Sequence, residues 1–257
     1  MSVTPAPGTP AAAPPSSAKV RLTKWIAKRV PAPLLYRILI RRSTIPTQEI
    51  FRAGFAASDP KRAALDIGAN RGIVSYCMSK RFAQVHSFEP NAELGDFLAK
   101  VLPSNCSLHR CGLSDAPGVT ELALVLEGGV PIHGKGRILS APEADKQFEV
   151  QSIRLETLDG QSIPDIGFIK IDVEGHEEKV IRGGMETLRK HKPVLVIEIE
   201  KRHTGRPVGE SLTLIEGLGY AGYFFEDGRQ RPVSEYQERM QDPDYPAYVT
   251  DFLFLPK

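Results

Sequence analysis

The stretch from Ala63 to Gly72, which reads A-A-L-D-I-G-A-N-R-G, constrains the fold of this chain more than any other. Its first half is a short apolar strand that contains Asp66, and Gly68 and Gly72 then form a tight turn. Apolar residues recur at helical spacing over residues 73–82. Glycine at position 68 permits a positive φ and a close approach of the backbone to a neighbour. A strand, a glycine turn and a helix in this order predict a site where backbone N–H groups and a helix N-terminus face a ligand.

A second apolar strand, residues 85–89, ends in Glu89-Pro90-Asn91. An acidic residue about 20 positions after such a glycine turn usually holds the hydroxyl groups of a ribose. The glycine spacing alone is a weak signal, because G-x-x-x-G turns also occur in structural corners. Asp66 and Gly68, followed by Glu89, together predict a nucleoside-containing cofactor.

The rest of the chain alternates between strand and helix without an internal repeat. Further strands are predicted at residues 107–113, 167–173 and 193–199, and helices at 72–81, 91–101, 177–190 and 208–218. Repeated βα units predict an α/β fold with a doubly wound, mostly parallel sheet. The last two predicted strands, 220–226 and 248–255, are joined by a loop alone and should therefore run antiparallel.

Residues 119–126 and 148–155 are predicted to form two antiparallel strands. They bracket a predicted loop, residues 127–147, which is rich in glycine and small residues. A loop of this length within a compact domain is usually functional or disordered. We therefore expect this segment to be one or the other.

The formal net charge of +2 conceals an uneven distribution of charge. Residues 1–48 contain no Asp or Glu, and the eight basic residues between Lys19 and Arg42 leave a net charge of −6 on the remainder. A mildly acidic body argues against a nucleic-acid-binding domain, which would carry a basic face. We therefore expect no nucleic acid among the partners of the body.

Three parts are predicted along the chain: a disordered Pro/Ala-rich tail (1–18), a basic helical arm (19–47) and a catalytic domain (48–257). Residues 19–42 contain two short helical patterns, each with an apolar face. These helices either pack on the domain or lie on an anionic membrane surface, which basic residues opposite Trp and Leu would suit. An acid-poor, Arg-containing N-terminus is also similar to a transit peptide.

The cysteine content and the hydropathy bear on the compartment. Cys77, Cys106 and Cys111 are an odd number without the spacing of a metal site, which predicts a reducing environment. No run approaches the ~18 apolar residues of a membrane-spanning helix. We therefore expect a cytoplasmic protein, either free or peripheral at the inner membrane surface. The oligomeric state does not follow from these features.

Polar residues gather at the predicted ends of strands, where a doubly wound sheet binds its ligands. They are Asp66, Glu89, Ser114, Asp115, Asp172, Glu174, Glu198 and Glu200. Lys170 and Asp172 alternate along a strand that is otherwise apolar, and burying either charge without a partner would be costly. A pair between Lys170 and Glu198 would satisfy both of these groups. Asp172, next to Glu174 and His176, points instead to a functional role.

Several motifs in a fixed order resemble those of the FkbM-type S-adenosylmethionine-dependent methyltransferases. They are L-D-I-G-A-N-x-G, F-E-P-N, G-L-S-D, S-I-R-L-E-T-L-D, I-K-I-D-V-E-G-H-E, I-R-G-G and V-I-E-I. The resemblance extends over residues 48–257, except for residues 127–147. It implies a Rossmann-like class I methyltransferase sheet of seven strands whose last pair is antiparallel. It also implies methylation of an oxygen, often a hydroxyl of a sugar, a glycan or a secondary metabolite.

The same resemblance implies the roles of individual residues. It places S-adenosylmethionine against Asp66, Gly68, Ala69, Asn70, Gly72, Glu89, Pro90, Asn91, Ser114 and Asp115. Within this set, the glycine turn would line the methionine part of the cofactor, Glu89 would hold the ribose hydroxyls, and Asp115 would lie near the adenine. Residues 172–176 would border the reacting centre.

Methyl transfer from a sulfonium is an in-line displacement, so catalysis depends on positioning the acceptor oxygen behind the methyl carbon. A hydroxyl is a poor nucleophile at neutral pH, and a general base should help. The candidate catalytic residues are Asp172, Glu174, His176 and Glu198. His176 is the favoured base because an unperturbed imidazole has a pKa of about 6.5, and Asp172 either orients it or acts itself. A divalent metal held by Asp172, Glu174 and Glu198 remains an alternative, but their spacing is no known metal signature and no metal ligand is assigned.

Two other functional classes remain open. An NAD-dependent oxidoreductase also carries Asp or Glu after a glycine turn, although D-x-G-A-N-x-G departs from the usual G-x-G-x-x-G. A catalytically silent cofactor-binding scaffold, tethered by its arm, is the other class. Binding of S-adenosylmethionine in preference to NAD would separate these classes.

Overall fold

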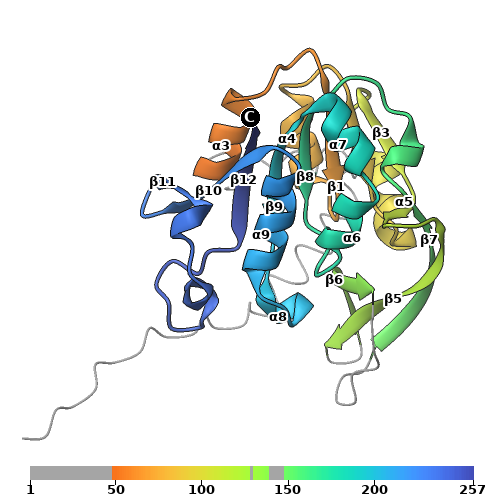
Figure 1. Cartoon of the computed structure of the whole chain (residues 1–257). Helices are drawn as coiled ribbons and strands as arrows, with labels where there is room; N and C mark the ends of the chain where they lie inside the picture. The colour runs from red at the N-terminus through yellow and green to blue at the C-terminus, as the bar shows by residue number, and fades with distance from the viewer. Residues whose placement is uncertain (1–47, 128–129, 139–147) are drawn as a thin grey trace, which may run out of the picture. The chain divides into compact units, whose positions relative to one another are not determined.

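The computed structural model describes residues 48–127, 130–138 and 148–257. The predicted tail (1–18) and basic arm (19–47) lie outside the described residues, as does part of the predicted loop. The described parts form a large, mostly parallel sheet between layers of helices, and a smaller sheet beside it (Figure 1). Among the described residues, no helix is long and apolar enough to span a bilayer.

The large sheet contains eight strands in the order β11-β10-β12-β9-β8-β1-β2-β3. Their bounds are β1 (Ala63–Ile67), β2 (Val85–Phe88), β3 (Cys106–His109), β8 (Ile166–Ile171), β9 (Val194–Glu198), β10 (Tyr220–Glu226), β11 (Arg229–Pro232) and β12 (Asp251–Pro256). The strand order reverses at β1, which has β2 and β3 on one side and β8 and β9 on the other. A topological switch point therefore lies at the carboxyl ends of β1, β2 and β8.

The pairing confirms the predicted doubly wound sheet. Strands β1, β2, β3, β8 and β9 are parallel, whereas β12 runs antiparallel to both β9 and β10. The predicted antiparallel arrangement of the last two strands is thereby confirmed. Strand β11 extends the sheet by one antiparallel strand at its edge.

Helices cover both faces of the large sheet. α3 (Glu49–Ala56) and α4 (Ile73–Ser79) pack on one face, and α6 (Glu177–Arg182), α7 (Met185–His191) and α9 (Val208–Gly217) pack on the other, in front of the sheet in Figure 1. The remaining α-helices of the described chain are α5 (Ala92–Val101) and α8 (Lys201–Thr204). Because helices cover both faces, β8 is buried along its whole length, which explains its almost continuous apolar sequence.

The aromatic side chain of Phe168 on β8 anchors the face covered by α3 and α4. Its ring centroid lies 5.1 Å from that of Phe55 and 5.6 Å from that of Phe82, and the side chain is fully buried. Truncating such a side chain to Ala typically costs about 3–5 kcal/mol of folding free energy. This packing fixes the position of β8, whose carboxyl end enters the site.

The smaller sheet has the strand order β4-β7-β5-β6. Its strands are β4 (Gly112–Leu113), β5 (Gly118–Glu127), β6 (Val130–Ile138) and β7 (Phe148–Glu156). β5 pairs antiparallel with β7, as predicted. The expectation of a loop over residues 127–147 is wrong for the part that forms β6: this segment has weak intrinsic strand propensity, but β5 supplies its hydrogen-bond partners.

Two predicted elements are divided in the structure. The strand expected over residues 107–113 is split between β3 and β4, because the chain bends at Cys111 and passes from the large sheet to the smaller one. The helix expected over residues 177–190 is split into α6 and α7 at Gly183 and Gly184. A Cβ at Gly183 would lie 1.9 Å from the carbonyl oxygen of Ser114. The absence of a side chain at this position therefore lets the end of α6 approach the residue that follows β4.

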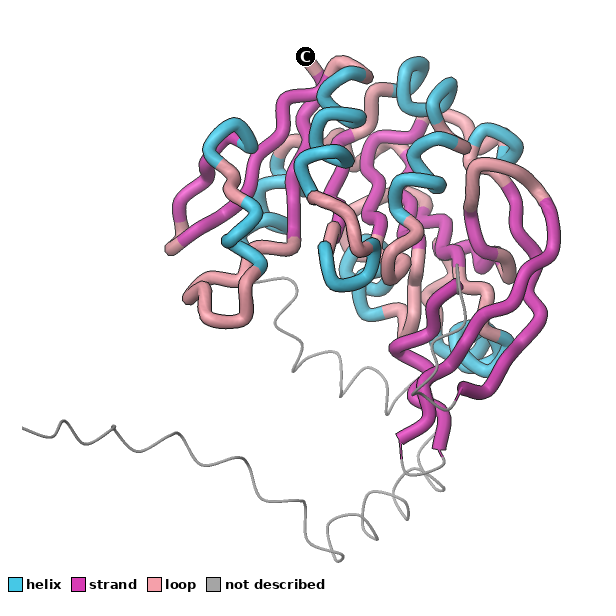
Figure 2. The backbone as a smooth tube through the Cα atoms, turned by 60° about the horizontal axis from the view of Figure 1, so that its bottom comes forward, coloured by secondary structure: helices cyan, strands magenta, loops and turns pink. Residues whose placement is uncertain are grey.

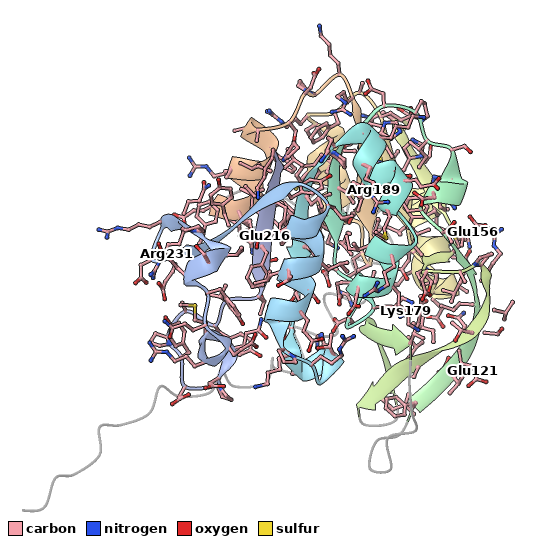
Figure 3. The ribbon with its side chains drawn as sticks, in the orientation of Figure 1. Glu121, Glu156, Lys179, Arg189, Glu216 and Arg231 are labelled. Carbon is pink, nitrogen blue, oxygen red and sulfur yellow. The ribbon has the colours of Figure 1, made fainter. Side chains whose placement is uncertain are left out.

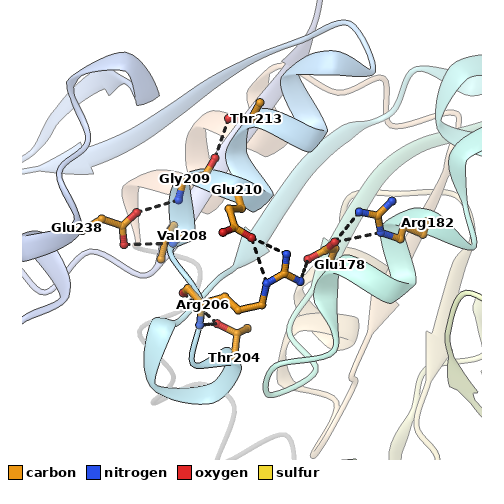
Figure 4. A network of polar contacts seen from close by, with 9 residues as sticks. All are labelled: Glu178, Arg182, Thr204, Arg206, Val208, Gly209, Glu210, Thr213 and Glu238. Atoms are coloured by element: carbon orange, nitrogen blue, oxygen red, sulfur yellow. Dashed lines mark hydrogen bonds and ion pairs between the residues drawn. The ribbon is translucent and has the colours of Figure 1, made fainter. Parts of the chain in front are cut away.

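A polar network joins α6 to the start of α9 (Figure 4). Arg206 Nη1 donates to Glu178 at 2.8 Å, and Arg206 Nε donates to Glu210 at 3.1 Å. The carboxylate of Glu238 accepts the first two N–H groups of α9 at 3.1 and 2.9 Å. The exposed ion pairs contribute only about 0–1 kcal/mol each, whereas a helix cap contributes about 1 kcal/mol. The cap is therefore the more important contact for the position of α9.

Candidate active site

The glycine turn after β1 lies at the switch point and is shaped by its neighbours. Gly68 has a φ of 80°, and the N–H groups of Gly68 and Ala69 both donate to the carbonyl of Phe88, at 3.1 and 2.9 Å. A Cβ at Gly68 would come within 1.9 Å of the backbone oxygen of Asp172. Glycine is therefore required at this position both for the φ and for the contact. Gly72, with a φ of 72°, precedes the first residue of α4.

Glu89 follows β2 and is only 6% exposed. Its Oε2 accepts the N–H of Asn70 at 2.7 Å, and its Oε1 accepts the N–H of Asn91 at 2.9 Å. Burial raises the pKa of Glu89, while these two N–H groups and the charge of Lys170 lower it. Each carboxylate oxygen has a further lone pair available, so the fixed carboxylate can accept hydrogen bonds from the hydroxyl groups of a ligand.

The turn and Glu89 form one wall of a cavity of about 690 Å³, a volume that includes its open mouth; we call it the first cavity. Leu122, Gly136 and Ile138 of the smaller sheet form the opposite wall. Figure 2 brings the lower side of the Figure 1 view forward and shows the strands of the smaller sheet next to the rest of the domain. The first cavity therefore lies at the switch point, where the fold predicts a ligand.

The first cavity brings together many of the residues that the sequence singled out. From the predicted cofactor set, its lining includes Gly68, Asn70, Glu89, Pro90 and Asn91. From the predicted catalytic set, its lining includes Asp172, Glu174 and His176. Ala69 and Gly72 shape the turn without contributing to the lining.

Asp66 lies behind the glycine turn rather than in the first cavity. Its side chain is fully buried, with Ser75 Oγ donating to its Oδ2 at 2.6 Å and Lys170 Nζ at 3.4 Å from its Oδ1. Lys170 also lies 3.2 Å from Oδ2 of Asp172. The expected pair between Lys170 and Glu198 is wrong, because the strand register sets Lys170 opposite Asp66 on β1.

The segment after β8 enters the first cavity through a tight turn. Glu174 and Gly175 have positive φ values of 54° and 99°. The buried carboxylate of Glu177 accepts the N–H groups of Val173 and Gly175, both at 3.1 Å. Glu177 therefore holds this turn in a conformation that carries the residues on both sides of it to the same mouth.

His176 lines the first cavity but lacks the ordinary imidazole pKa that the sequence suggested. It is buried, and its Nε2 lies 2.9 Å from Oγ of Ser114. Burial lowers the pKa of His176 to about 4, and the charge of Lys179, labelled on α6 in Figure 3, acts in the same direction. The expected pKa of about 6.5 is therefore wrong, and the imidazole is neutral at pH 7.

Ser114 and Asp115 follow β4 and do not line the first cavity. Ser114 is 3% exposed, and its hydroxyl lies 2.9 Å from Oδ1 of Asp115 as well as from the imidazole of His176. Asp115 is exposed and lines a separate depression next to α6. Ser114 therefore contacts the lining of the first cavity through His176, and Asp115 is connected to it through Ser114.

A second cavity lies beside the first and shares Asp172 with it. Glu198 and Asp251 also line this second cavity, together with Lys170. Burial and the charge of Asp172 raise the pKa of Glu198 to about 10 and that of Asp251 to about 6. Glu198 therefore carries its proton at neutral pH, and it hydrogen-bonds to Glu200.

Among the described residues, no group of three or more His, Cys, Asp or Glu side chains has the arrangement of a metal site. The alternative metal set from the sequence is divided between the two cavities. Glu174 lines the first cavity and lies 3.1 Å from His203, whereas Glu198 lines the second. Asp172 is the member that contacts both.

The sequence interpretation missed the apolar half of the first cavity. Leu113, Leu122 and Ile138 come from the smaller sheet, and Cys111 comes from the bend that leads into it. The alternating apolar residues of β5 predicted a strand but not what that strand would cover. Asp251, which precedes an apolar run, was missed as well; a charge at the start of a buried strand is the signal that could have identified it.

The strand order, with an antiparallel β12 inserted between β9 and β10, defines a Rossmann-like class I methyltransferase fold. Within this class, the chain belongs to the methyltransferase FkbM domain family, whose match extends over residues 66–224. Family membership implies S-adenosylmethionine as the methyl donor.

Known proteins that are similar to this chain include the following three. The hexuronic acid methyltransferase AglP of Haloferax volcanii is 26% identical over 152 residues, which are 58% of this chain and 61% of AglP. This chain therefore spans about three fifths of the length of that relative. A crystal structure of methyltransferase FkbM from Methylobacillus flagellatus matches 90% of this chain and 60% of its own, with 16% identity and a TM-score of 0.49. A precorrin-6y C5,15-methyltransferase of Geobacter metallireducens matches 82% and 88%, with 15% identity and a TM-score of 0.44.

Proposed function

We propose that this chain transfers a methyl group from S-adenosylmethionine to a hydroxyl oxygen of a sugar, a glycan or a secondary metabolite. The observation that carries the proposal is the carboxylate of Glu89, held by two backbone N–H groups at the switch point. It lies in the same cavity as the glycine turn and Asp172. A donor for the methyl group and a group that can accept a proton would thus share one cavity.

The residues of the first cavity fit S-adenosylmethionine. Glu89 can accept hydrogen bonds from both hydroxyls of a ribose. Gly68 carries no Cβ, which lets the turn after β8 pack against the glycine turn, and Gly68 itself lines the cavity. Leu113, Leu122 and Ile138 offer an apolar wall that suits a flat base. When bound, this cofactor supplies an electrophilic methyl group on a positively charged sulfur.

Asp172 is the residue that we assign to the proton of the acceptor hydroxyl. It lies at the boundary of the two cavities, and Lys170 fixes its carboxylate. Glu198 retains its own proton at neutral pH, and the imidazole of His176 is a weak base. His176 instead joins the turn after β8 to Ser114 and orders that side of the cavity.

A sugar acceptor is the class that we favour. It is supported by the name of the relative AglP, a hexuronic acid methyltransferase. It is also supported by the chemistry of the second cavity. A carboxylate there can accept a hydrogen bond from a hydroxyl group, and a protonated carboxyl group can donate one to it. Incubating the chain with methyl-labelled S-adenosylmethionine and a panel of activated sugars and lipid-linked glycans tests the proposal. Label in an O-methyl ether supports it, whereas label confined to nitrogen or carbon, or transfer only to other classes of acceptor, contradicts it.

We also propose that the basic arm brings the enzyme to an anionic membrane surface. Residues 19–42 carry eight basic and no acidic side chains, and each basic residue near such a surface contributes about 1 kcal/mol. Deleting residues 1–42 should abolish sedimentation with anionic vesicles at low salt, whereas deleting residues 1–18 should not. Failure of the full chain to sediment would contradict this proposal.

A further inference from the structure

Lys170 is a charged residue in β8, a strand of the large sheet that is buried along its whole length. Its side chain is 7% exposed, and its Nζ donates to the carbonyl oxygen of Gly68 at 2.8 Å. The same Nζ lies 3.2 Å from Asp172 and 3.4 Å from Asp66. The ammonium group thus donates a hydrogen bond to Gly68 and forms ion pairs with Asp172 and Asp66, and Oδ1 of Asp66 is buried without a hydrogen-bond partner of its own.

The three partners of Lys170 belong to different parts of the site. Gly68 begins the glycine turn, Asp172 begins the turn after β8, and both turns line the first cavity. Asp66 is itself held by Ser75, whose Oγ lies 2.8 Å from Oγ of Ser87. Lys170 therefore connects a fixed buried network to both of the turns that form the first cavity.

Stability alone is a weak reason for such an arrangement. Removing the ammonium of Lys170 and the carboxylate of Asp66 from water costs several kcal/mol per ion, and the attraction between them often does no more than offset this cost. Well-packed apolar residues at the same positions would stabilise the sheet as well or better. The geometry therefore points to a role in placing the groups that Lys170 contacts.

We propose that Lys170 is a positioning residue, whose ammonium group fixes the carbonyl of Gly68 and the carboxylate of Asp172 relative to each other. This inference rests on the proposed function, because it concerns how the same site is held for methyl transfer. Displacing a reacting group by as little as 1 Å can lower a rate by about 10²-fold. Loss of Lys170 should accordingly impair both cofactor binding and turnover.

The charge of Lys170 acts on further carboxylates around the site. The carboxyl groups with which it interacts are Asp66 on β1, Glu89 after β2, Asp172 after β8 and Asp251 on β12, and Glu198 on β9 lines the second cavity with it. Burial raises the pKa of Glu89 and of Asp251, and Lys170 opposes this effect in both. Without the ammonium charge, the pKa of Glu89 should rise. If cofactor binding requires the ionised form of Glu89, binding should then be lost at a higher pH than in the wild type as the pH is lowered.

The test compares Lys170→Gln with Lys192→Met, using the full chain. Lys192 is a matched control, because its Nζ also donates to backbone carbonyls, those of Leu218 at 3.0 Å and Gly219 at 3.4 Å, but contacts neither cavity. The affinity for S-adenosylhomocysteine is measured by calorimetry from pH 5 to 9, together with the melting temperature. We expect Lys170→Gln to lower the affinity about tenfold at pH 7 and to move the acid midpoint of binding upward. Lys192→Met should lower the melting temperature and leave the midpoint unchanged.

A folded Lys170→Gln chain with wild-type affinity and an unchanged midpoint would overturn the inference. If this variant does not fold, Lys170→Arg decides the question, because it keeps the charge but replaces the compact ammonium by a planar fork. Lys170→Arg should keep the wild-type midpoint and lower kcat by about 10²-fold, and wild-type kcat would overturn the inference. Failure of the wild-type chain to bind S-adenosylhomocysteine would instead overturn the proposed function.

Discussion

The two cavities share Asp172 but surround their carboxylates in different ways. In the first cavity, backbone N–H groups of Asn70 and Asn91 contact the carboxylate of Glu89 and favour its ionised form. In the second cavity, carboxyl groups face one another, and the pKa of Glu198 rises to about 10. Glu89 therefore accepts hydrogen bonds from backbone donors, whereas Glu198 retains its own proton. The comparison separates a carboxyl group that contacts backbone donors from one that is surrounded by other acids, and our proposal assigns the cofactor to the first cavity and proton transfer to Asp172 at the boundary of the two.

Asp172→Asn should have the largest effect, because Asp172 serves both cavities. Asparagine keeps the size of the side chain but cannot accept the proton of the acceptor hydroxyl. We expect kcat to fall by about 10²–10⁴-fold, with cofactor affinity within a few-fold of the wild type. Glu174→Gln, a change in the same turn, is the control and should lose much less. Full activity of Asp172→Asn in a labelled-methyl assay would place proton transfer elsewhere.

Gly68→Ala tests how closely the two turns approach each other. A side chain at φ 80° costs about 1–3 kcal/mol, and the clash of its Cβ with the backbone oxygen of Asp172 should add to this cost. Gly205→Ala is the control, because Gly205 has a φ of 67° and a Cβ added there would meet no atom within 4 Å. Urea denaturation should show a larger loss of unfolding free energy for Gly68→Ala. Equal losses of unfolding free energy in the two variants would mean that the close contact between Gly68 and Asp172 leaves room for a side chain.

The sequence predicted the first cavity better than the second for a physical reason. The glycine turn and Glu89 are local patterns. The conformation of Gly68 depends on its own backbone, and the position of Glu89 depends on where the strand before it ends. Their placement is therefore readable from a short stretch of chain. The antiparallel last pair of strands was also readable, because the loop between them excludes a crossover.

The properties of the second cavity depend on the register between distant strands. Lys170 meets Asp66 rather than Glu198 because β8 pairs with β1 in one specific register. Asp251 reaches the cavity because β12 inserts antiparallel next to β9. The pKa of His176 depends on its burial, which no local pattern reports. Strand β6 was likewise missed, because its stability comes from β5 rather than from its own sequence.

Glu198→Gln sharpens the comparison through the pH dependence of stability. The pKa of Glu198 is raised from 4.5 to about 10 in the folded chain, so the folded state keeps a proton that the unfolded state loses above its ordinary pKa. The stability contributed by this group is therefore present at low pH and falls as the pH rises between the two values. Glutamine is neutral throughout, so the melting temperature of Glu198→Gln should rise relative to the wild type between pH 5 and 9. Parallel pH curves for the two chains would contradict the raised pKa of Glu198, and Glu210→Gln is an exposed control.

His176→Asn should have the smallest effect on catalysis. Burial lowers the pKa of His176 to about 4, so the imidazole does not titrate near neutral pH and is a weak base there. We expect kcat to change less than about tenfold, since an asparagine can still contact Ser114, and we expect the wild-type pH–rate profile to lack a step at about pH 6.5. A loss of about 10²-fold or more, together with a wild-type step at that pH, would restore His176 as the base.

Calorimetric titration of the wild-type chain and Glu89→Ala with S-adenosylmethionine and with NAD tests the central claim most directly. The wild type should bind S-adenosylmethionine and not NAD. Glu89→Ala should remain folded and lose about 1.5–3 kcal/mol of binding free energy, because the diol loses a charged acceptor. Preference of the wild type for NAD, or unchanged affinity in a folded Glu89→Ala chain, would contradict the assignment of the first cavity to S-adenosylmethionine.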